Sequence, residues 1–85
     1  MDVKTKVKEI AESKGMVYIE SYGGNDKLMD FGKWILNKLD KHNDRLTTDG
    51  VVFERIGHCM TFCIKAKFEN ESDEKFVEVY LLHDH

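Results

Sequence analysis

The chain has 85 residues, which is the length of one small domain (1–85) with room for only a thin hydrophobic core. A hydrophobic content of 41% beside a charged content of 34% is typical of a folded globular protein and argues against a disordered chain. The formal net charge of −3 makes nucleic-acid binding an unfavoured function, because nonspecific binding depends on cations that neutralise phosphates.

The N-terminal part of the chain shows no targeting segment. Residues 2–15 are rich in lysine and glutamate, and no apolar run is long enough to cross a membrane. The two cysteines, Cys59 and Cys63, lie four positions apart on one predicted strand, so their Cα atoms would be about 13 Å apart. A disulfide requires a Cα separation of less than roughly 7 Å. We therefore expect a cytoplasmic protein with reduced thiols and no membrane contact.

Two amphipathic helices are predicted from apolar residues at helical spacing. The first covers residues 2–14 and ends at Gly15, and the second covers residues 27–42. Their apolar stripes consist of Val3, Val7, Ile10 and Ala11 in the first helix, and Leu28, Phe31, Ile35 and Leu39 in the second. A glycine in a helix interior lowers helix stability by roughly 1 kcal/mol relative to alanine. We expect Gly32 to stand there because it allows the helix to approach the sheet or the first helix closely.

Strict alternation of apolar and polar residues predicts the central strand of a sheet at residues 58–68. Further strands are predicted at 16–22, 51–56 and 75–82, and residues 43–50 are expected to form a polar connection that ends in an Asp49-Gly50 turn. Short connections favour an antiparallel meander, and matching the core faces pairs Lys65 or Lys67 with Glu78. The prediction is an α+β two-layer sandwich in the order α-β-α-β-β-β, with two helices on one face of a mostly antiparallel four-stranded sheet.

Histidine and cysteine side chains gather at one end of the predicted hairpin. They are His58, Cys59, His83 and His85. These are ligands that zinc prefers, but their spacing matches no common zinc pattern and the C-terminal tail is expected to fray. An exposed thiol on a strand also lacks the neighbours that would make it a nucleophile. Since no dinucleotide or Walker motif is present either, we expect no metal, no cofactor and no catalytic residue.

Aromatic side chains are expected on the face of the sheet that the helices leave open. The predicted outward residues are Tyr18, Tyr22, Phe76, Tyr80, Leu82, Cys59 and Cys63, with Val52 or Phe53 as a further member. A solvated face should carry more charge, so this composition indicates a protein partner or a second copy of the chain. An ordinary surface is the next interpretation, and stacking of RNA bases is the least favoured, because the chain is acidic.

Trp34 lies outside the apolar stripe of the second predicted helix and has Lys38 one turn away. Such an indole is either covered by the first helix or presented to a partner. The sequence thus predicts a small non-enzymatic protein-binding module, a regulatory or inhibitory accessory protein of the kind that viruses and phages encode. The alternatives are a homodimeric structural protein, an RNA-binding sheet module and a Cys/His metal-binding protein.

Overall fold

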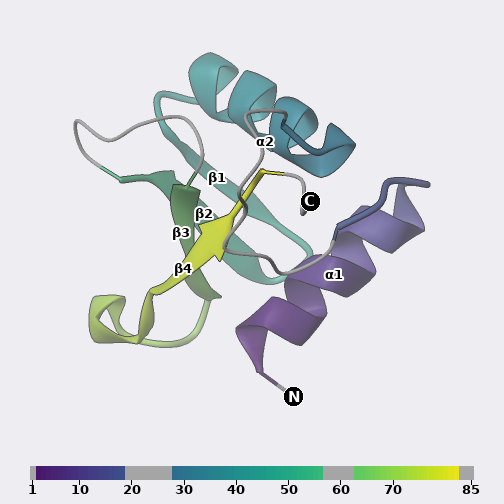
Figure 1. Ribbon diagram of the computed structural model, residues 1–85. Helices are drawn as coiled ribbons and strands as arrows, with labels where there is room; N and C mark the ends of the chain where they lie inside the picture. The colour runs from purple at the N-terminus through teal and green to yellow at the C-terminus, as the bar shows by residue number, and fades with distance from the viewer. Residues whose placement is uncertain (1, 19–27, 57–62, 83–85) are drawn as a thin grey trace.

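A four-stranded antiparallel sheet forms one layer of the fold (Figure 1). The computed structural model describes residues 2–18, 28–56 and 63–82. Within them, the strands lie side by side in chain order: β1 (Arg45–Thr48), β2 (Val51–Arg55), β3 (Cys63–Phe68) and β4 (Val77–Tyr80). A short 3-10 helix, η1 (Asp73–Lys75), lies in the connection between β3 and β4.

The register of β3 and β4 follows from the alternation of their side chains. The pairs are Ile64 with Val79, Ala66 with Val77, and Lys65 with Glu78. A shift by one residue would place the aliphatic side chains on the wrong face, which fixes this register. The predicted matching of core faces and the Lys65–Glu78 pair are both confirmed.

The hairpin of β1 and β2 differs from the prediction. Its turn is the expected Asp49-Gly50, and both residues have positive φ angles, 51° and 80°. The residues before the turn form strand β1, however, so the prediction of a polar connection over 43–50 was wrong. Leu46 is the one large apolar side chain of β1, and it pairs opposite Phe53. One such residue in a four-residue edge strand is too short a signal for sequence alternation to detect.

The first predicted strand is the second difference. Residues 16–18 lie in no strand, and the remainder of the predicted 16–22 segment falls outside the described residues. The order in the described part of the chain is therefore α-α-β-β-β-β, with β1 as the fourth strand of the sheet. The α+β class, the two helices and the four-stranded antiparallel sheet are confirmed.

Two helices cover one face of the sheet (Figure 1). Helix α1 (Val3–Ser13) packs on β2 and β3, and α2 (Asp30–Lys41) packs on β1 and β2. The carboxylate of Asp2 caps α1 by accepting a hydrogen bond from the Thr5 N–H at 2.8 Å. Both predicted helices are confirmed to within a few residues at each end. No helix in the described ranges has the length and apolar character needed to cross a membrane.

The apolar stripes of both helices meet the inner face of the sheet in one core. Fully buried members include Val7, Phe31, Ile35, Leu39, Phe53 and Ile64. The Phe31 and Phe53 rings meet edge-on with centroids 6.2 Å apart. Each such side chain contributes about 1.5–3 kcal/mol through the removal of its apolar surface from water.

Gly32 is the point at which α2 comes closest to the chain that follows β4. A Cβ atom at this position would lie 3.0 Å from both the Cβ and the carbonyl oxygen of Leu81. The Met29 N–H donates to the same Leu81 oxygen at 2.8 Å, and Leu28 forms an antiparallel bridge with Leu82. A close approach at Gly32 is thus confirmed, and the neighbour is the chain that directly follows β4 and not the first helix.

Candidate functional site

The outer face of the sheet is the face opposite α1 and α2, and neither of these two helices packs on it. Strand register and alternation assign its members, which are Arg45, Thr47, Val52, Glu54, Cys63, Lys65, Lys67, Glu78 and Tyr80. Phe76 belongs to the same face, because the ammonium groups of Lys65 and Lys67 lie over its ring, 4.7 and 5.6 Å from its centroid.

A ladder of alternating charges crosses the middle of the outer face. Arg45 forms an ion pair with Glu54, whose other carboxylate oxygen lies 3.5 Å from Lys65 Nζ. Lys65 is opposite Glu78 in the register, and the Tyr80 hydroxyl donates a 2.8 Å hydrogen bond to Glu78 Oε2. A single exposed ion pair stabilises a protein by about 1 kcal/mol or less. The ladder matters more for orientation, since it fixes the position of Tyr80.

Lys67 is the buried charge of the outer face, with only 5% of its surface exposed. Its ammonium donates a 2.7 Å hydrogen bond to the Glu71 carbonyl oxygen and lies 3.7 Å from Asp73 Oδ1. These contacts tie the β3–β4 connection back onto β3. The same ammonium lies over the Phe76 ring, so Lys67 also holds that ring in place.

The structure separates the aromatic residues that were predicted to share the outer face. Phe76 and Tyr80 lie there and are half-buried, as expected. The placement of Tyr18 was wrong: its ring is 2% exposed and packs on Phe31 with centroids 5.3 Å apart. The alternation argument failed because residues 16–18 are not in a strand. Tyr22 lies outside the described residues.

Two small outer-face residues are more buried than the sequence suggested. Cys63 is 5% exposed and Val52 is 2% exposed, although neither α1 nor α2 packs over them. Val52 lies between Thr47 and Lys67 in the register. The aliphatic part of a lysine can cover apolar surface while its charged end reaches a polar group, and Lys67 is placed to do this for Val52. Cys63 pairs opposite Tyr80, whose ring is the largest neighbour in that register.

Trp34 forms a second surface, on the helical side of the molecule. Its ring is half-buried, with its centroid 6.0 Å from that of Phe31, and the ammonium of Lys14 lies 5.0 Å from the indole centroid. Lys14 directly follows α1, so the end of that helix covers part of the ring. Lys38, one turn further along α2, is also half-buried.

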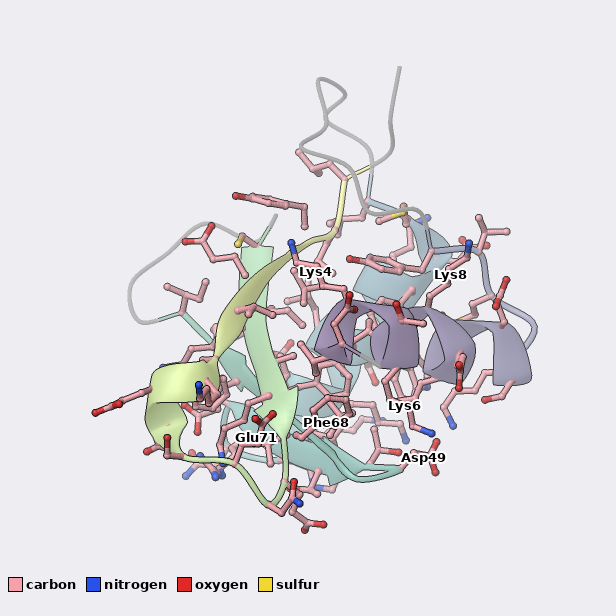
Figure 2. All side chains as sticks on the ribbon, turned by 90° about the horizontal axis from the view of Figure 1, so that it is seen from below. Lys4, Lys6, Lys8, Asp49, Phe68 and Glu71 are labelled. Carbon is pink, nitrogen blue, oxygen red and sulfur yellow. The ribbon has the colours of Figure 1, made fainter. Side chains whose placement is uncertain are left out.

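An open groove of about 420 Å³ separates the start of α1 from the β3–β4 connection. It is lined by Asp2, Val3, Phe68, Glu71, Lys75 and Val77. Figure 2 shows Phe68 and Glu71 facing this end of α1. The hydrogen bond from the Thr5 N–H lowers the pKa of Asp2, which commits this carboxylate to capping the helix. The residues that line the groove include no histidine or cysteine, so they do not form a Cys–His pair of the kind used in nucleophilic catalysis.

The predicted histidine and cysteine cluster cannot be placed. His58, Cys59, His83 and His85 all lie outside the described residues. Among the residues that are described, no group of three or more histidine, cysteine or carboxylate side chains could hold a metal ion.

Sequence reasoning missed Arg45 and the tie made by Lys67. Arg45 lies in the segment that was predicted to be a polar connection, so its position beside Glu54 could not be predicted. The contact between Lys67 and the Glu71 carbonyl spans four residues around a turn, and no side-chain pattern encodes it. No protein-family model, curated protein or solved structure matches the chain.

Proposed function

We propose that the chain is a small non-enzymatic protein-binding module that contacts its partner through the outer face of the sheet. One observation carries this proposal: Phe76 and Tyr80 are half-exposed on a face that neither α1 nor α2 covers, and a cation–π contact holds the first ring while a hydrogen bond holds the second. Aromatic side chains that are already fixed lose little conformational entropy on binding, and such residues often dominate interface energies.

The charges of the outer face favour a protein over RNA as the partner. RNA would need lysines for its phosphates and exposed rings for its bases. Lys65 is already paired with Glu54, and the ammonium of Lys67 is bound to the Glu71 carbonyl. Glu54 and Glu78 would repel phosphates at the centre of the face. A protein surface of mixed charge can instead complement the ladder.

The size of the sheet sets an expectation for affinity. Four strands spaced about 4.8 Å apart, each with about five residues rising 3.3 Å, give a flat face of roughly 300 Å². A stable interface buries about 800 Å² on each partner. We therefore expect a transient complex, or one that extends from the sheet onto the β3–β4 connection. A transient contact suits a cytoplasmic regulatory or inhibitory accessory protein, which is the role we assign.

The test is affinity capture from the native host cell with wild-type protein and a Phe76→Ala/Tyr80→Ala double variant. The double variant should lose a partner that the wild type retains, because both anchoring rings are gone. Val17→Ala is the matched control, since Val17 is an exposed apolar residue (60%) outside the outer face. Circular dichroism should show that all three proteins are folded.

Light scattering addresses the alternative of a homodimer. A dimer that dissociates in the double variant would identify a second copy of the chain as the partner. If the wild type is a strict monomer and the double variant retains every captured protein, the outer face is not the contact surface.

A further inference from the structure

The Trp34 surface consists of one indole and three surrounding lysines: Trp34, Lys14, Lys38 and Lys41. Positions 34, 38 and 41 fall on one side of α2, because residues four and seven apart are neighbours on a helix. Lys14 reaches the same place from the end of α1, where its ammonium lies 5.0 Å from the indole centroid. Two helices thus bring positive charge to one half-buried aromatic ring.

Among the described residues, the carboxylates in and just after the last turn of α2 pair with a residue other than these lysines. Asp40 is the acidic residue nearest the end of α2, but it forms an ion pair with Arg55 of β2. Arg55 also donates a 2.9 Å hydrogen bond to Asp44, so these two carboxylates face the sheet end and not the lysines. Asp30 lies one turn before Trp34 and contributes a single negative charge, so with three lysines the surface keeps a net positive charge. In contrast, the charges of the ladder on the outer face alternate and cancel, and Lys67 there lies 3.7 Å from Asp73.

We propose that the Trp34 surface binds an acidic segment of a protein, with carboxylates on the three lysines and an apolar side chain against the exposed part of the indole. Tryptophan is one of the residue types most often found among energetically dominant interface residues. The complementary charge would also accelerate association. A nucleic acid is disfavoured by the chain's net charge of −3. The inference does not depend on the outer face, which is on the other side of the sheet.

A purely structural role for the lysines predicts a different outcome. Lys38 and Lys41 lie in the last turn of α2, where positive side chains interact favourably with the helix dipole. Neutralising them would then lower the stability of α2 and leave the binding of an acidic peptide unaffected. Lys14 is the C-cap residue of α1, so the dipole of α1 favours a positive charge there but does not account for the contact of its ammonium with the Trp34 ring.

The experiment uses Trp34 as its own reporter, because it is the only tryptophan in the chain. The probe is a short synthetic peptide in which glutamates flank a leucine, titrated at low ionic strength while tryptophan emission is recorded. Binding should change the emission, and 0.5 M salt should abolish it, since exposed charges are screened beyond about 4–5 Å at this ionic strength. A Lys14→Gln/Lys38→Gln/Lys41→Gln variant should bind at least tenfold more weakly.

The matched control is Lys4→Gln/Lys6→Gln/Lys8→Gln, which removes the same number of charges from the first part of α1 (Figure 2). With both triple variants compared at 0.1 M salt, it should bind the acidic peptide within about threefold of the wild type, because charges more than about 10 Å from the peptide are then largely screened. Equal weakening in both triple variants, or no emission change in the wild type, would overturn the proposal. Tighter binding of oligouridylate than of the peptide would overturn it in favour of a nucleic acid.

Discussion

Gly32→Ala tests whether the close approach of α2 to Leu81 is real, because two effects of opposite sign act at this position. Helix propensity alone predicts that alanine stabilises the protein by about 1 kcal/mol. The new Cβ, however, would lie 3.0 Å from two Leu81 atoms, whereas carbon atoms prefer separations of about 3.5–4.0 Å. Overpacking of this kind costs about 1–3 kcal/mol.

The neighbour of Gly32 cannot move away easily, which decides the sign. Its two nearest atoms are a Cβ and a backbone oxygen, and that oxygen accepts the Met29 N–H at 2.8 Å. We therefore expect Gly32→Ala to lower the free energy of unfolding by about 1 kcal/mol. For a domain of this size that shift corresponds to a fall in Tm of about 4–8 °C.

The assay is urea denaturation followed by circular dichroism, with Asn37→Ala as the control. Asn37 is exposed in the interior of α2, so alanine there should stabilise by about 0.5 kcal/mol through propensity alone. If Gly32→Ala is instead as stable as the wild type or more stable, Leu81 does not lie against the helix as described. The two substitutions must differ in sign for the packing argument to hold.

Two further substitutions test the anchoring of the β3–β4 connection and of α1. Lys67→Met keeps the apolar stem but removes the hydrogen bond to the Glu71 carbonyl, so the free energy of unfolding measured by urea denaturation should fall by about 1–2 kcal/mol. The control is Lys65→Met, which removes only an exposed ion pair and should lower it by less than about 1 kcal/mol. Equal effects would mean that the contact between Lys67 and Glu71 does not stabilise the protein. The pKa of Asp2 is lowered from 3.8 by the Thr5 N–H, so its contribution to stability is complete above pH 3.8 and is lost as the pH falls through the lowered value. The gap in Tm between the wild type and Asp2→Ala should therefore narrow as the pH falls from 5 to 2, and a constant gap would contradict the assigned cap.

The sequence was sufficient to predict elements whose signal is long and regular. Both helices and the register of β3 with β4 followed from periodicity, because burial of one face constrains every second or every third to fourth residue. Strand β1 has four residues and one large apolar side chain, so its position is determined by pairing with β2 and not by its own pattern. The formation of β1 therefore depends on its neighbours in the folded chain and could not be predicted from its own residues.

The residues of the candidate site could be predicted only where the strand that carries them was predicted. Phe76 and Tyr80 were placed correctly because their strand was predicted correctly. Tyr18 was misplaced because three residues of apparent alternation, 16–18, do not form a strand, and Phe31 offered its ring a buried position. The ladder from Arg45 to Glu78 could not be predicted, since it requires the order of all four strands.

The two proposed surfaces should respond differently to salt, and this difference can assign any complex to one of them. On the outer face, the two carboxylates Glu54 and Glu78 balance the charges of Arg45 and Lys65, so a partner gains little from long-range attraction there. The Trp34 surface has a net positive charge, and its attraction to an acidic segment falls as the Debye length shortens from about 10 Å at 0.1 M salt to 3 Å at 1 M. A complex that survives 1 M salt but not the loss of Phe76 and Tyr80 uses the outer face. A complex with the opposite behaviour uses the Trp34 surface, so a salt series on wild-type protein distinguishes the surfaces before any variant is made.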